Sequence, residues 1–132
     1  FRASQSVAKV MLVKGSGSII NMSSQMGHIG SPNRTLYCTT KHAVEGLTKS
    51  LAVELAPKGI RVNAVAPTFI DTPMTRPMFE NADFKKTVEN NIALGHVGKV
   101  EDVAAAVLFL ASPAAAMITG ESLKVDGGWT AW

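Results

Sequence analysis

The sequence predicts an α/β fold built around a parallel sheet. Segments with the apolar spacing of helices alternate with short apolar runs along the 132 residues. Parallel strands need long crossover connections, which these helical segments supply. Polar residues follow the apolar runs at Ser24, Thr68 and Asp126. Because ligands of such sheets bind at the carboxyl ends of the strands, we expect the functional site there.

The first two elements are predicted to be a helix and a strand. Apolar residues recur at helical spacing over residues 1–13, and Gly15 and Gly17 interrupt the pattern. Residues 18–23 form a short apolar run between a glycine-rich turn and a polar loop, which is typical of a buried parallel strand. This Gly-x-Gly leads into a strand rather than a helix, so we interpret it as an ordinary turn and not as a phosphate-binding loop.

The clearest helix is predicted over residues 36–56, after a loop at 25–35. Pro57 ends the helix, and residues 60–66 form a second strand candidate. The apolar positions of the helix recur every three or four residues and predict a buried face of Val44, Leu47, Leu51 and Leu55.

The last part of the chain is expected to combine a mobile segment with a helix and a strand. Residues 68–98 are rich in Thr, Pro, Asn and Gly and include a weakly amphipathic stretch, so we expect a substrate-binding loop or lid with short helices. A helix follows at 100–111 and a short strand at 122–125. The predicted buried face of that helix consists of Val103, Val107 and Leu110.

Composition and charge argue against several classes of function. The net charge is +3, but the basic residues are scattered and do not alternate with aromatic ones, so we expect no nucleic-acid partner. His28, His42 and His96 have no metal-ligand spacing, and we predict no metal site. The single Cys38, the lack of a long apolar run and the polar start predict a cytoplasmic chain with no membrane segment.

The strongest candidates for chemistry are Ser24, Tyr37 and Lys41. Tyr37 and Lys41 are four residues apart, so they share a helix face and an ammonium can lie beside a phenol. A free tyrosine titrates near pH 10, and a neighbouring cation favours the phenolate that general-base catalysis needs. Ser24 ends the preceding strand, where its hydroxyl can orient a substrate oxygen. The alternatives are a chance pair on a solvated helix and a serine that caps a turn.

Four segments in order resemble signatures of the short-chain dehydrogenase/reductase family. They are Asn21–Ser24, Tyr37–Lys41, Gly59–Pro67, and Ile118–Gly120 with Val125–Gly128. The resemblance covers nearly the whole chain. It implies that residues 1–132 are the C-terminal half of a single NAD(P)-binding Rossmann-type domain, a doubly wound parallel sheet with flanking helices. The dinucleotide-binding half of such a domain would lie upstream of Phe1.

The resemblance also implies roles for individual residues. Ser24 would hold the substrate oxygen, Tyr37 would be the acid/base, and Lys41 would favour the phenolate. The cofactor, NAD or NADP, would contact Tyr37, Lys41, Pro67, Ile70 and Thr72. Thr68 stands where the family usually has Gly, so its Cβ either narrows the nicotinamide pocket or is tolerated at negative φ. Residues expected to contact substrate are Ser24, Gln25, His28, Met74 and His96.

The resulting expectation is an NAD(P)-dependent oxidoreductase that interconverts a secondary alcohol and a ketone. A sugar, polyol, hydroxy acid or 3-oxoacyl compound is the expected substrate, and the family resemblance implies a homo-oligomer, either a dimer or a tetramer. Two alternatives remain open. The 132 residues are a catalytically inactive fragment or interaction module, or they are one part of a split enzyme that a separate N-terminal chain completes.

Overall fold

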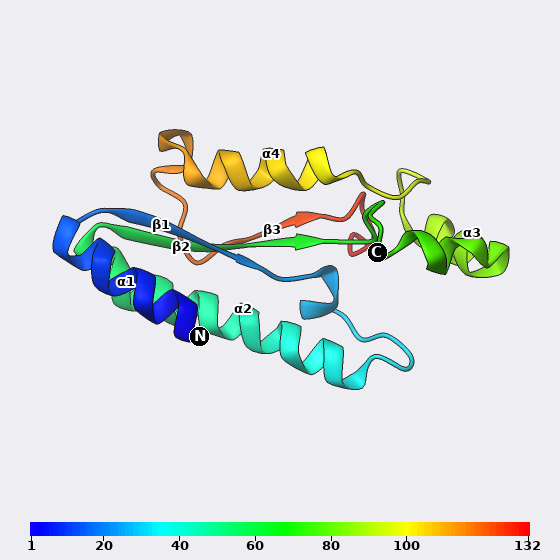
Figure 1. Ribbon diagram of the computed structural model, residues 1–132, viewed down its shortest axis with the longest axis horizontal. Coiled ribbons are helices and arrows are strands. Elements are labelled where there is room, and N and C mark those ends of the chain that lie inside the picture. The colour runs from blue at the N-terminus through cyan, green and yellow to red at the C-terminus, as the bar shows by residue number, and fades with distance from the viewer.

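Three parallel strands form the central layer of the protein (Figure 1). The computed structural model describes all residues from Phe1 to Trp132. Strands β1 (Gly17–Met22), β2 (Ile60–Pro67) and β3 (Ser122–Val125) lie in the order β1-β2-β3. Ile19 is paired with Val62, and Val65 with Leu123. The predicted α/β fold with a parallel sheet is therefore confirmed.

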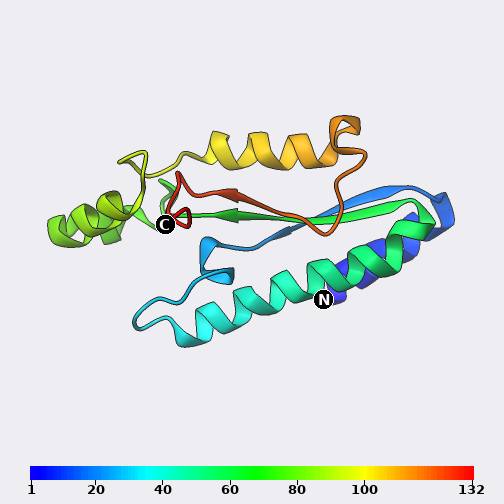
Figure 2. The ribbon, with the colours of Figure 1, turned by 180° about the vertical axis from the view of Figure 1, so that it is seen from behind.

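Helices cover both faces of this sheet. Figures 1 and 2 show α1 (Arg2–Lys14) and α2 (Thr35–Leu55) on one face and α4 (Val100–Ala111) on the other. Successive strand residues point to opposite faces, so the neighbours Ile19 and Ile20 pack into different cores. The core beneath α1 and α2 contains Ala8, Ile19, Ala52, Leu55, Ile60 and Val62. The core beneath α4 contains Val65, Ala106, Leu110 and Ala115.

The buried face of α2 differs in part from the predicted one. Val44, Leu47 and Leu51 are only half-buried, whereas the polar Glu45 and Thr48 are fully buried. The Thr48 hydroxyl and Glu45 Oε1 have partners that offset part of the cost of desolvation, whereas Glu45 Oε2 is buried without one. The Thr48 hydroxyl donates to the Val44 carbonyl and accepts from Asn21 Nδ2 at 2.9 Å. Apolar spacing alone misplaced the centre of this face, because it gives polar residues no weight.

The segment from residue 68 to residue 98 contains short helices, as predicted. These are η3 (Arg76–Glu80) and α3 (Ala82–Asn91), and the Asn81 side chain caps α3 by accepting from Phe84 N–H at 2.9 Å. Four aromatic rings join this segment to the C-terminal end, with Phe69 in contact with each of the others at centroid distances of 5.7–6.2 Å. The cluster consists of Phe69, Phe79, Phe84 and Trp129.

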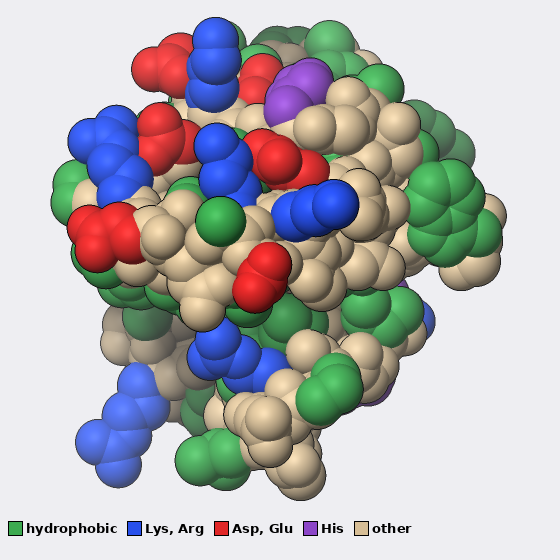
Figure 3. All heavy atoms as spheres, turned by 90° about the vertical axis from the view of Figure 1, so that its right-hand side faces the viewer, with side chains coloured by type: hydrophobic (Ala, Val, Ile, Leu, Met, Phe, Trp, Pro, Cys, Tyr) green, Lys and Arg blue, Asp and Glu red, His purple; other side chains and the backbone are tan.

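Three further 3-10 turns complete the chain: η1 (Gln25–Gly27), η2 (Ala56–Lys58) and η4 (Pro113–Ala115). The strands all point toward the end of the molecule where η1, α3 and the C-terminus lie (Figure 1). Figure 3 views that end directly, and acidic and basic side chains are interspersed over its upper part. None of the helices is both long enough and apolar enough to pass through a bilayer.

Candidate active site

Ser24 lies immediately beyond β1, where the chain turns into η1. Its hydroxyl caps η1 by accepting from Met26 N–H at 3.2 Å, so the capping role considered from the sequence is present. The same oxygen is 3.5 Å from the Pro67 carbonyl at the end of β2, which is the long limit for a hydrogen bond. One lone pair is therefore used, while the hydroxyl hydrogen is weakly held and can be donated to another oxygen.

Tyr37 and Lys41 lie on the first turns of α2, which the loop from 28 to 34 brings back beside the end of β1. The Lys41 ammonium lies over the Tyr37 ring, 5.5 Å from its centroid. It also donates to the Met22 carbonyl at 3.1 Å, which fixes its position against the sheet. The tyrosine side chain remains 43% exposed. The spacing that suggested a pair thus corresponds to an ammonium group held above an accessible phenol.

Ser24 and Tyr37 line one cleft of about 270 Å³ at the carboxyl ends of the strands. Four other residues predicted for the site line it as well, namely Gln25, Ile70, Thr72 and Met74. The remaining lining residues are Met26, Arg34, Thr68, Phe69, Thr75 and Met78. Arg34 could have been found from the sequence, since it precedes Tyr37 by one helical turn.

The wall formed by residues 68–78 is held by local hydrogen bonds. Ile70 makes a parallel bridge to Gly98, and the Thr75 hydroxyl donates to the Ile70 carbonyl. Arg76 donates to Asp71 at 2.7 Å, and this hydrogen bond lowers the pKa of the exposed Asp71 carboxyl. Thr68 has no positive φ, so its Cβ is tolerated there. Its hydroxyl oxygen is buried without a partner beside the cleft.

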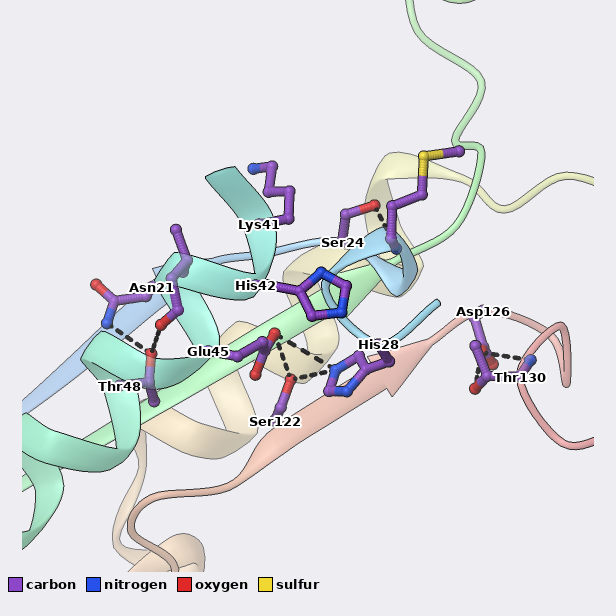
Figure 4. A network of polar contacts seen from close by, with 12 residues as sticks. Asn21, Ser24, His28, Lys41, His42, Glu45, Thr48, Ser122, Asp126 and Thr130 are labelled. Carbon is purple, nitrogen blue, oxygen red and sulfur yellow. Dashed lines mark hydrogen bonds and ion pairs between the residues drawn. The ribbon is translucent and has the colours of Figure 1, made fainter. Parts of the chain in front are cut away.

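His28 is not among the residues that line this cleft, and its contact with substrate stays a prediction. Figure 4 shows its ring turned toward Glu45 of α2 and Ser122 of β3. His28 Nε2 lies 3.0 Å from Ser122 Oγ and 3.4 Å from Glu45 Oε1. Ser122 donates its only hydrogen to Glu45 at 3.0 Å, so the geometry requires Nε2–H as the donor toward Ser122.

This buried cluster fastens the loop after Ser24 to α2. Glu45 is 6% exposed, and a Cβ at Gly27 would come within 3.0 Å of its Cγ and within 2.9 Å of Ser23 Oγ. Only glycine permits that approach of loop and helix. No periodic pattern marks Glu45 in the sequence, because its burial depends on partners distant along the chain.

His96 lies outside the cleft as well. It is exposed and lines a neighbouring hollow that also contains Thr68, Asp126 and Gly128. Pro67 contributes its carbonyl to Ser24, and Lys41 lies beside the cleft rather than in its lining. The structure gathers no group of three His, Cys, Asp or Glu side chains able to hold a metal ion.

Comparisons with known proteins agree on one family of enzymes. A family model described as enoyl-(acyl carrier protein) reductase matches residues 1–130. The 3-oxoacyl-[acyl-carrier-protein] reductase of Thermotoga maritima is 46% identical over 97% of this chain and 51% of its own length. The L-xylulose reductase of Mus musculus is 45% identical over 98% of this chain and 54% of its own.

Solved structures that resemble this chain are dehydrogenases as well. A gluconate 5-dehydrogenase from Burkholderia cenocepacia, in complex with NADP and tartrate, matches with a TM-score of 0.94 and 35% identity over 98% of this chain and 51% of that one. A 4-hydroxyisoleucine dehydrogenase complexed with NADH gives a TM-score of 0.96 and 36% identity over 100% of this chain and 55% of that one. The chain spans about half the length of the relatives it matches.

Proposed function

Because this chain belongs to the short-chain dehydrogenase/reductase family, we propose that the protein containing it interconverts a secondary alcohol and a ketone with NAD or NADP. The observation that carries the proposal is the shared cleft of Ser24 and Tyr37, with the Lys41 ammonium above the phenol ring. The curated relatives are oxidoreductases, and the two similar solved structures described above contain NADP or NADH. Cytoplasmic location and a dimer or tetramer stay predictions.

The residues beside the cleft fit a nicotinamide cofactor. The Thr68 hydroxyl is buried without a partner, and the exposed Tyr37 and the half-buried Lys41 present polar groups on the adjoining face of α2. We assign contacts with the cofactor to Tyr37, Lys41, Pro67, Ile70 and Thr72. When bound, the cofactor would accept hydride from the alcohol carbon or return it to the ketone.

The proton side of the reaction follows from the hydrogen bonds of the site. Ser24 Oγ accepts from Met26 N–H, and its own hydrogen is held only weakly by the Pro67 carbonyl at 3.5 Å, so the hydroxyl can donate to the substrate oxygen instead. During oxidation, the Tyr37 phenolate takes the hydroxyl proton as the C–H bond breaks and the carbonyl forms. Reduction reverses both transfers. The Lys41 ammonium stabilises the phenolate by its charge, and the Met22 carbonyl keeps it in place.

The direct test is Tyr37→Phe in the full-length gene product that contains these residues. Loss of the phenolic oxygen removes the proton acceptor, so kcat should fall by about 10³-fold or more. The dissociation constant for NADPH, measured by fluorescence, should change only a few-fold.

The matched control is Thr39→Val on the same helix. The Thr39 hydroxyl is exposed and donates only to the Thr35 carbonyl, so its loss should leave turnover within a few-fold of wild type. Near-normal turnover in Tyr37→Phe would refute the acid/base assignment.

A second candidate, for the 132 residues taken alone, is an inactive module. The affinity of a dinucleotide site comes largely from a phosphate-binding turn at a helix N-terminus, and the sequence contains no such motif. Titration of the 132-residue chain with NADH and NADPH distinguishes the two: micromolar binding contradicts the module, and no binding supports it. Activity recovered on mixing with a separate N-terminal chain would identify a split enzyme.

A further inference from the structure

We propose that Arg34 makes the cleft selective for substrates that carry a carboxylate, so that the secondary alcohol belongs to a short hydroxy acid or sugar acid. This inference rests on the proposed function, since it concerns the substrate of the same cleft.

Arg34 is the only residue with a full charge at neutral pH among the twelve that line the cleft. A second hollow of about 480 Å³ adjoins the cleft and shares Met26, Arg34 and Phe69 with it. The lining of that hollow contains no aspartate or glutamate either. A bound anion therefore meets a cation with no competing carboxylate on the walls, whereas a cationic substrate meets only repulsion.

The Arg34 guanidinium makes no hydrogen bond or ion pair within the chain, and its side chain is exposed. The other arginines near the sheet and the lid are engaged. Arg61 donates to the carbonyls of Leu110 and Ser112, and Arg76 donates through two nitrogens to Asp71. No contact within the chain therefore accounts for an arginine at position 34, and all the N–H donors of its guanidinium group are available to a ligand.

Gln25 adds a second free donor to the same cleft. Its side chain is 1% exposed, and its amide nitrogen has no acceptor. A buried donor without a partner is costly, so an acceptor on a bound substrate would stabilise the complex. A carboxylate supplies two acceptor oxygens, and the planar guanidinium group matches it through paired N–H donors.

The positions of Arg34 and Tyr37 fit a single short molecule. They are three residues apart at the start of α2 and line the same cleft. One substrate can therefore present its carboxylate to Arg34 and its secondary alcohol to Tyr37 and Ser24. Neutral polyols lack the group that Arg34 recognises.

The test compares acids with neutral analogues in the full-length protein. Three pairs, gluconate with sorbitol, galactonate with galactitol and xylonate with xylitol, differ only in the terminal carboxylate. We expect wild type to prefer the acid in at least one pair by about tenfold or more in kcat/KM, a gap typical of a recognised charged group. Arg34→Gln should reduce that preference about tenfold, mainly through KM, and Arg34→Lys should retain part of it.

Arg76→Gln is the matched control, because it removes a nearby arginine whose guanidinium group is already paired with Asp71. It should leave the preference for the acid over the alditol unchanged. Equal losses for acid and alditol in Arg34→Gln, or a preference for alditols in all three pairs, would overturn the inference. So would oxidation of other alcohols with no turnover of any acid.

A binding measurement separates this inference from the proposed function. Calorimetry with tartrate and with its neutral diamide needs no turnover. Tighter binding of tartrate than of the diamide, with an affinity for tartrate that falls about tenfold in Arg34→Gln, supports the carboxylate subsite even if no alcohol is oxidised. Equal affinity for both compounds, or tartrate binding unchanged in Arg34→Gln, contradicts it.

Discussion

The Asp126 carboxylate organises the turn that follows β3 (Figure 4). Its Oδ1 accepts from Gly128 N–H at 3.0 Å, and its Oδ2 accepts from the Thr130 N–H at 3.1 Å and from the Thr130 hydroxyl at 2.7 Å. Burial alone would raise the pKa of this carboxyl. The hydrogen bonds from Thr130 and Gly128, with a smaller effect of Lys124, lower the pKa below its usual range.

Asp126→Ala should therefore destabilise the protein in a pH-dependent way. At pH 7 the loss of charged hydrogen bonds should lower the free energy of unfolding by about 2 kcal/mol. A carboxyl with a lowered pKa in the folded state stabilises above its unfolded pKa, and this contribution is lost as the pH falls through the folded value. In denaturant titrations from pH 7 to pH 3, the difference in free energy of unfolding between Asp126→Ala and wild type should become smaller. A gap of constant size would contradict this account.

Individual site residues differed in how far the sequence could predict them. Ser24 and Tyr37 were predictable because a strand end and a helix start leave local patterns, and both line the cleft. The sequence could not show where His28 points, because its ring orientation depends on Glu45 and Ser122, which are distant in sequence. The position of Arg34 beside Tyr37 could be predicted from their spacing, but the absence of other charges around it depends on the folded loop, and a linear pattern does not contain that information.

At the scale of elements, the entry into β2 depends on a close approach of two turns. Gly59 follows η2 with φ of 77°, and a Cβ there would clash with the Gly15 carbonyl oxygen. Gly15 itself ends α1 with φ of 69°. The two glycines let the ends of α1 and α2 meet where β1 and β2 begin.

Gly59→Ala should destabilise the protein by about 2 kcal/mol or more, because alanine is strained in the left-handed region and its Cβ meets backbone. Gly46→Ala is the matched control within α2, where nothing lies within 4 Å of the added Cβ. It should stabilise the helix by up to about 1 kcal/mol. Thermal and urea unfolding measure both changes, and equal effects of the two substitutions would contradict the argument.

The order and type of the elements were predictable, because apolar spacing and glycine or proline stops are local. The predicted helix at 36–56 is observed as Thr35–Leu55, and the predicted strand at 60–66 as Ile60–Pro67. The face of α2 was only partly predictable. Its buried centre includes Glu45 and Thr48, whose burial depends on hydrogen bonds to other elements.

At the scale of the whole molecule, the aromatic cluster connects the cleft wall to the C-terminal end. Phe69 lies beside the cleft, and the Trp129 ring packs against it at 5.7 Å. Phe79 and Phe84 extend the contact into η3 and α3. The residues that follow β3 thereby support the wall opposite Tyr37.

Trp129→Ala should loosen η3 and α3 while leaving the sheet protected. Removing a half-buried indole takes away the packing that orders the segment against the body of the protein, so its amides should exchange about tenfold faster or more. Hydrogen-exchange mass spectrometry measures this segment by segment. Trp132→Ala is the control, since that side chain is 78% exposed. Equal changes in both variants would exclude the role of the cluster.

The attachment of Glu45 to His28 and Ser122 limits how the length of this chain can vary. An extra residue in the loop from 28 to 34 bulges into solvent and leaves the rest of α2 in place. An extra residue between Lys41 and Glu45 rotates the first turns of α2 by about 100° relative to the anchored part and advances them by about 1.5 Å. Insertions and deletions are thus tolerable in the loop before the helix but not between Lys41 and Glu45, so α2 fixes where Tyr37 and Lys41 lie relative to the anchor at Glu45.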